Sequence, residues 1–176
     1  MHKKCKRRVW YSDLDLIYYY RNNMKKRYVI VPAIVIAVAL IGQYFTGQGM
    51  DWYATLRLHS WNPSGLVIGM VRTVIFVLGA ISTILFWTQS KHDKTFGIAI
   101  SLFVDNIILN ILRSWLFFVK HRIIVSIVEM ILLWIVTVLM ILAVWKRSRW
   151  SAYLLFPYAL WLMIATFFVI RIYLLN

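Results

Sequence analysis

Five ionisable side chains lie inside long apolar runs of this sequence. They are Arg72, Asp105, Arg113, Glu129 and Arg171. A charged side chain at membrane depth costs roughly 2.5–3.5 kcal/mol on insertion scales, so it must face a protein interior, pair with another group, or extend to the membrane interface. Arg171 and Glu129 lie close enough to the ends of their runs to reach the interface, and this alternative is also open to Arg72, near the outer end of its run. Inside a helix bundle, the chemistry open to these groups is ion pairing or the binding of an acidic ligand.

The third apolar run contains more polar residues than the other runs, and these form a stripe of side chains that can make hydrogen bonds. Asn106, Asn110 and Arg113 are spaced i, i+4, i+7, which places them on one face of a helix, and Asp105 lies beside that face. Such a stripe cannot face lipid without leaving donors and acceptors unpaired. Two interpretations stay open: a packed seam between helices, or the lining of a cavity for solvent or ligand.

An aromatic ridge runs along the last apolar run. Tyr158, Trp161, Ala165 and Phe168 are spaced i, i+3, i+7, i+10 and share a face. A ridge of this kind is more typical of core or lipid contact than of a ligand site, so its residues alone do not decide between these roles.

The sequence shows no catalytic constellation. Its histidines, His2, His59, His92 and His121, have no metal-ligand spacing. A phosphate-binding glycine loop and a nucleophilic serine elbow are both missing, and the carboxylates are too few and scattered for paired acid–base catalysis. We therefore expect no metal site and favour a binding protein over an enzyme.

The elements that must position these residues are five apolar runs of about 20 residues, the length of a helix that crosses a bilayer. Hydrophobic residues make up 62% of the chain, well above the roughly 45–50% of soluble domains. We predict an all-α membrane protein, a five-transmembrane-helix bundle in residues 29–176 behind a basic tail, residues 1–28. The expected spans are Val29–Phe45, Leu66–Trp87, Thr95–Val119, Ile123–Trp145 and Ala152–Leu175, with Pro32 in the first turn of the first helix, where proline is tolerated.

The net charge of +14 is concentrated at one side of this bundle. Nine Lys and Arg precede Tyr28, and the loops on that side raise the count to fourteen, against three on the other side. The positive-inside rule therefore predicts a cytoplasmic N-terminus and a C-terminus on the opposite side. We expect this charge to contact anionic membrane lipids, not nucleic acid.

Four segments follow one another in a characteristic order along the chain. The first is "DWYATLRLHSWNPSGLVIGMVRT", with Trp52, Trp61 and Pro63, and the second is "NILRSWLFF", with Asn110. The third is Glu129 followed by Leu133-Trp134. The fourth pairs Pro157-Tyr158 with Trp161 and Ala165, and the chain closes on Leu175-Asn176. In this order the segments resemble the TspO/MBR family, the tryptophan-rich sensory proteins that include the translocator protein.

The resemblance implies a five-helix bundle with a pocket that opens toward the long first loop. It further implies binding of porphyrins, haem-related tetrapyrroles or sterol-like ligands, in a sensory or transport-related role, with no resident cofactor and with a homodimer as one available assembly. A porphyrin-degrading enzyme and a lipid-interacting scaffold are the alternatives. Carried over from the family, the ligand-binding positions are Trp61, Asn110, Tyr158, Trp161 and Ala165.

Two departures from the family pattern bear on the ligand. Arg72 and Arg113 stand where the family motifs have tryptophan. We add both to the expected ligand site, because guanidinium groups complement carboxylates such as the propionates of a porphyrin. We expect the two arginines to face one interior and either to share an acid, Asp105 or Glu129, or to receive an acidic ligand.

Overall fold

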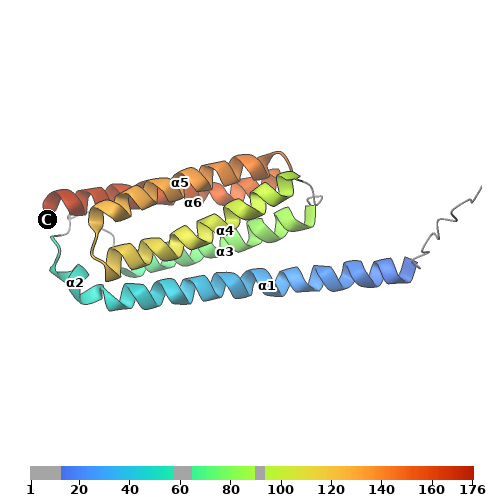
Figure 1. The fold of residues 1–176 in the computed structure, drawn as a ribbon, viewed down its shortest axis with the longest axis horizontal. Coiled ribbons are helices and arrows are strands. Elements are labelled where there is room, and N and C mark those ends of the chain that lie inside the picture. Colours follow the sequence, from blue (N-terminus) through green and yellow to red (C-terminus); the bar gives the residue numbers. More distant parts are fainter. Residues whose placement is uncertain (1–12, 58–64, 90–93) are drawn as a thin grey trace, which may run out of the picture.

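The computed structural model describes residues 13–57, 65–89 and 94–176, with side chains from Tyr28 onward. Figure 1 shows long helices lying side by side, with one of them extending well past the others. The elements in chain order are α1 (Asp13–Gln48), α2 (Met50–Thr55), α3 (Gly65–Gln89), α4 (Lys94–Ser114), the π-helix η1 (Trp115–Val119), α5 (Ile123–Trp145) and α6 (Arg149–Leu175).

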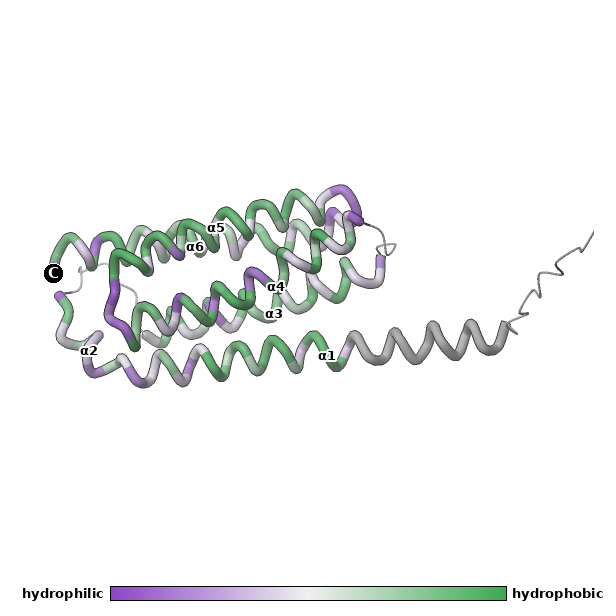
Figure 2. The backbone as a smooth tube through the Cα atoms, viewed as in Figure 1, coloured by the Kyte–Doolittle hydropathy of each residue, from purple (hydrophilic) through white to green (hydrophobic). Residues whose placement is uncertain are grey.

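Five of the described helices are long and apolar enough to cross a membrane. The spans are Tyr28–Gln48 within α1, then α3, α4 together with η1, α5 and α6. Apolar residues dominate these segments along their length (Figure 2), and the described part of the chain contains no strand. The all-α, five-span fold expected from the apolar runs is confirmed.

The first helix differs from its prediction. It begins at Asp13 instead of near Val29, so Pro32 lies in the helix interior and not in the first turn. The segment that precedes Tyr28 contains neither glycine nor proline, so nothing in it stops the helix from continuing toward the N-terminus. Pro32 removes one backbone donor and favours a bend at that point.

A buried apolar cluster lies at the end of the bundle away from α2. It contains Phe86, Met140, Val144 and Leu155, each almost fully buried. A hydrogen bond of 2.8 Å from Ser82 Oγ to a backbone carbonyl of α6 joins α3 to α6 at the same end. We call the opposite end of the bundle the α2 side (Figure 1).

A side-chain clasp joins the two chain segments that meet on the α2 side. Asn176 accepts a hydrogen bond from the Arg57 backbone N–H at 2.9 Å and donates to the Arg57 carbonyl at 3.2 Å. Its amide nitrogen also lies 2.9 Å from the Ile172 carbonyl. The asparagine amide therefore substitutes for a backbone pairing partner and holds the end of the α2 segment against α6.

Replacing Asn176 with alanine is expected to release Arg57 with little loss of global stability, about 0.5–1 kcal/mol, because this pair is exposed and each hydrogen bond contributes modestly. Hydrogen exchange at the Arg57 amide should accelerate at least tenfold, while exchange in α5 stays unchanged. Unchanged protection at Arg57 would show that the clasp does not hold this segment.

Candidate functional site

A cavity of about 340 Å³ opens among the helix ends on the α2 side. Its walls are mainly apolar and come from α1, α2, α3, η1 and α6, with two residues from α4 and one from α5. The described lining residues are Gln43, Thr46, Met50, Tyr53, Gly65, Ile68, Gly69, Arg72, Arg113, Ser114, Phe117, Phe118, Met130, Trp161, Ala165, Phe168, Val169 and Ile172. Such a volume lies at the lower end of the ~300–1,000 Å³ typical of ligand pockets.

Arg72 extends from α3 across the bundle toward α1 and α4. Its Nη2 donates a hydrogen bond of 3.1 Å to Ser114 Oγ, and its guanidinium lies 5.4 Å from the centre of the Phe76 ring. A side chain at Gly42 of α1 would overlap Nη2, so the glycine provides the space that the guanidinium occupies. Within the described residues no carboxylate pairs with Arg72.

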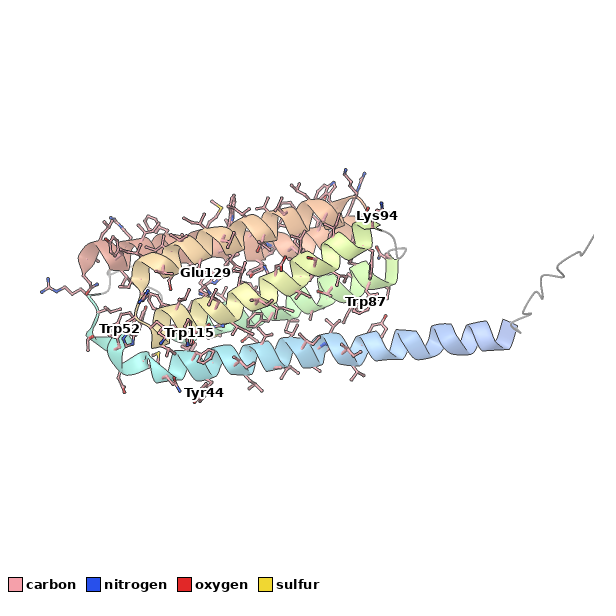
Figure 3. The ribbon with its side chains drawn as sticks, viewed as in Figure 1. Tyr44, Trp52, Trp87, Lys94, Trp115 and Glu129 are labelled. Atoms are coloured by element: carbon pink, nitrogen blue, oxygen red, sulfur yellow. The ribbon has the colours of Figure 1, made fainter. Side chains whose placement is uncertain are left out.

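Arg113 lines the cavity from the end of α4, and Glu129 approaches it from α5. The Nε of Arg113 is buried and has no acceptor among the described residues. Glu129 is only 5% exposed, and in the described part of the chain neither of its oxygens accepts a hydrogen bond. Figure 3 shows its side chain on the α2-side half of α5. Asp105, the other candidate partner, lies on the exposed face of α4.

These three charges lie at one depth. Arg72 is seven residues into α3, Glu129 is six residues into α5, and Arg113 is six residues before the end of η1. At 1.5 Å per residue, each is about 9–10 Å from the α2-side end of its helix. The bundle therefore carries a layer of two guanidinium groups and one carboxyl group at the depth of the cavity.

The asparagine stripe forms a closed hydrogen-bond network deeper in the bundle. Tyr158 Oη donates to Asn106 Oδ1 at 3.1 Å and accepts from Asn110 Nδ2 at 2.6 Å. Asn106 Nδ2 donates to Thr137 Oγ1 at 2.9 Å, and Thr137 in turn donates to the Leu133 carbonyl at 2.8 Å. The residues of the stripe therefore have different roles. The asparagines form a packed seam between helices, and Arg113 lines a cavity.

Comparisons with known proteins show which family shares this architecture. A model of the TspO/MBR family matches residues 29–174. The chain belongs to the TspO/MBR family. It is 33% identical over 154 residues to the tryptophan-rich protein TspO of Bacillus cereus, covering 87% of this chain and 99% of the relative. The Chlorobaculum tepidum TspO is 32% identical over 81% of this chain and 91% of its own length, and the human translocator protein is 26% identical over 77% and 85%.

The expected ligand residues of this TspO/MBR protein divide between two cavities. Arg72, Arg113, Trp161 and Ala165 line the large one. Asn110 and Tyr158 belong to the seam and border a smaller cavity of about 70 Å³. Trp61 lies outside the described residues, so its place in the site stays a prediction.

Part of the TspO/MBR cavity wall comes from residues that the sequence did not single out. Gln43 and Thr46 contribute from α1, and two consecutive phenylalanines, Phe117 and Phe118, contribute from η1. Both phenylalanines lie in the π turn, which is seen in the Lys120 N–H to Trp115 carbonyl bond of 3.1 Å. Segments of π-helix occur frequently at functional sites, although no sequence pattern reveals one.

A Gly65-x-x-x-Gly69 pattern, of the kind that permits close packing of membrane helices, opens α3 of this TspO/MBR chain. A Cβ at either glycine would meet no atom within 4 Å in the described structure. Both glycines instead line the cavity, so within the described bundle their small size adds to the cavity and does not bring helices together.

Proposed function

We propose that this TspO/MBR protein binds a flat, largely apolar ligand with acidic side groups, of the porphyrin class, in the α2-side cavity. The observation that carries the proposal is the pair of cavity-lining guanidinium groups, Arg72 and Arg113. Among the described residues neither is hydrogen-bonded to a carboxylate, and the one carboxyl group at their depth, Glu129, can compensate only one of the two positive charges. Unpaired guanidinium groups in an apolar cavity are costly, and an acidic ligand offsets that cost.

The remaining cavity walls suit a planar apolar body. Trp161, Phe117 and Phe168 line the cavity from two sides, α6 and η1. Aromatic side chains contact flat ring systems by stacking and edge-to-face packing and bury large apolar areas. A sterol-like ligand would use the same walls but would leave both guanidinium groups without a partner, so the arginines favour an acidic tetrapyrrole over a sterol.

The orientation of the protein in the membrane determines the side from which a ligand reaches the cavity. The distribution of Lys and Arg favours a cytoplasmic N-terminus, which places α2 and the cavity on the opposite side. The ligand would then enter from the non-cytoplasmic side, consistent with a sensory or transport-related role. Labelling of a single cysteine introduced at exposed Arg57, with Cys5 replaced by serine, by a membrane-impermeant reagent on intact cells tests this placement.

The decisive experiment compares an acidic ligand with its ester. Protoporphyrin IX and its dimethyl ester are titrated into the purified protein, with quenching of tryptophan fluorescence as the readout. Because a hydrogen bond to a charged group contributes about 1.5–3 kcal/mol, the acid should bind roughly 10–100-fold more tightly than the ester. Arg72→Trp and Arg113→Trp should each remove most of that preference.

The matched control is Arg171→Trp, which removes an exposed arginine that lies over Phe167 outside the cavity. It should retain the preference for the acid. Two outcomes would overturn the proposal: no quenching by either porphyrin, or Arg72→Trp and Arg113→Trp variants that gain stability with unchanged affinity. The second outcome would identify the arginines as packing residues of a membrane scaffold.

A further inference from the structure

Glu129 is a buried carboxyl group that the proposed binding mode leaves unused. It is 95% buried, yet in the described structure both of its oxygens lack a hydrogen-bond donor. Ser126 Oγ, one turn earlier on the same face of α5, is fully buried and also lacks a partner among the described residues. A carboxylate in such surroundings keeps its charge only if a nearby positive charge compensates it.

The compensating charge is Arg113. Arg113 lies on α4 at the same depth in the bundle as Glu129 on α5, and a positive charge at that depth favours the ionised form of a buried carboxyl group. Arg113 also lines the cavity together with Arg72. One guanidinium therefore faces two places for a negative charge, the protein carboxylate and the ligand.

The other ionisable groups near α5 do not change this balance. From α6, Tyr158 is held in the asparagine network, and Arg171 is exposed. From α4, Asp105 is exposed, and η1 contains no ionisable residue. In the described structure Arg113 is thus the positive charge that compensates Glu129, and Arg72 affects Glu129 indirectly because it shares the cavity with Arg113.

We propose that binding of an acidic ligand at Arg72 and Arg113 is coupled to the uptake of one proton by Glu129, an inference that rests on the proposed function. In the empty cavity the two arginines and ionised Glu129 carry a net charge of about +1. A ligand with two carboxylates changes this to about −1, which a site of low polarity disfavours. Transfer of one proton from solvent to a Glu129 oxygen restores neutrality as Arg113 turns to the ligand.

Calorimetry tests this coupling directly. Protoporphyrin IX is titrated into the purified protein at one pH, in buffers with different enthalpies of ionisation. The dependence of the observed enthalpy on the buffer gives the number of protons taken up, which should be about one per ligand bound for the unaltered protein and about zero for Glu129→Gln. The Glu129→Gln variant should still bind the acid, and about tenfold more tightly, since the ligand no longer competes for Arg113 and no proton must be supplied.

Two controls separate this coupling from the binding proposal. Asp51→Asn removes an exposed carboxylate from α2 and should leave the uptake at about one proton. The dimethyl ester brings no charge and should bind without uptake. If protoporphyrin binds with an enthalpy that is independent of the buffer, or if Glu129→Gln retains the uptake, the coupling is wrong while binding stands. If protoporphyrin does not bind at all, the proposed function itself fails.

Discussion

Replacing Gly49 with alanine is expected to lower the free energy of unfolding by about 1–3 kcal/mol, the range seen when a tightly packed site is overfilled. Gly49 lies at the corner between α1 and α2. A Cβ there would overlap the Phe118 carbonyl oxygen and would lie 2.7 Å from the Phe118 Cβ and 2.8 Å from its carbonyl carbon. These atoms belong largely to the backbone of η1, so relief requires η1 to move as a unit.

The effect of this change is steric and not conformational. Gly49 has φ −104° and ψ 5°, which lies outside the left-handed region that favours glycine, so alanine can adopt this conformation. The matched control is Gly47→Ala, two residues earlier, where a Cβ would meet nothing within 4 Å and where alanine in a helix should stabilise by up to about 1 kcal/mol. Thermal unfolding in one detergent should therefore move in opposite directions for the two variants. Similar melting temperatures would mean that α1 does not contact η1 this closely.

Replacing Asn106 with leucine is expected to cost about 2 kcal/mol. Leucine removes the acceptor of the Tyr158 hydroxyl and the donor to Thr137, so two buried hydroxyl groups lose a partner. Each unsatisfied buried group costs about 1–3 kcal/mol in soluble proteins, and single hydrogen bonds between membrane helices contribute about 0.6–2 kcal/mol. Chemical unfolding in mixed micelles measures the loss.

A double-mutant cycle with Tyr158→Phe shows whether the loss comes from the network. Once Asn106 is leucine, the Tyr158 hydroxyl keeps Asn110 as a partner but loses its Asn106 acceptor, so its removal should cost less than in the unaltered protein, by about 1 kcal/mol. Strictly additive losses would show that Asn106 and Tyr158 stabilise the bundle independently, contrary to the observed geometry.

The sequence predicted the spans well because a single physical requirement determines them. A membrane helix needs about 20 apolar residues, and the runs found on this basis fall within the spans of the structure. The start of α1 was missed for a related reason. Polar residues mark where the lipid core ends, but they do not end a helix, so the interior position of Pro32 was not visible in the hydrophobic pattern.

The candidate site was only partly predictable. Arg72 and Arg113 were identifiable because charges inside apolar runs demand an interior, and both line the cavity. Sequence spacing placed Asn110 and Arg113 on one face of a helix. It could not show that Asn110 packs in the seam while Arg113 lines the cavity, because this difference depends on the hydrogen bond between Asn110 and Tyr158 of α6. The space that Gly42 gives to Arg72 likewise depends on how α1 lies against α3.

The depth of Arg72 has an electrical consequence. Seven residues into a helix of 25 residues, it lies about 10 Å along a span of about 37 Å, so a ligand carboxylate that reaches it crosses roughly a quarter of the membrane field. One charge that crosses the whole membrane changes its free energy by ~2.3 kcal/mol per 100 mV. At 100 mV, two carboxylates that cross a quarter of the field therefore change the binding free energy by about 1.2 kcal/mol, roughly a sevenfold change in affinity. For the proposed acidic ligand we therefore expect membrane voltage to change the binding affinity, and we expect the sign of that change to report the side on which the cavity opens.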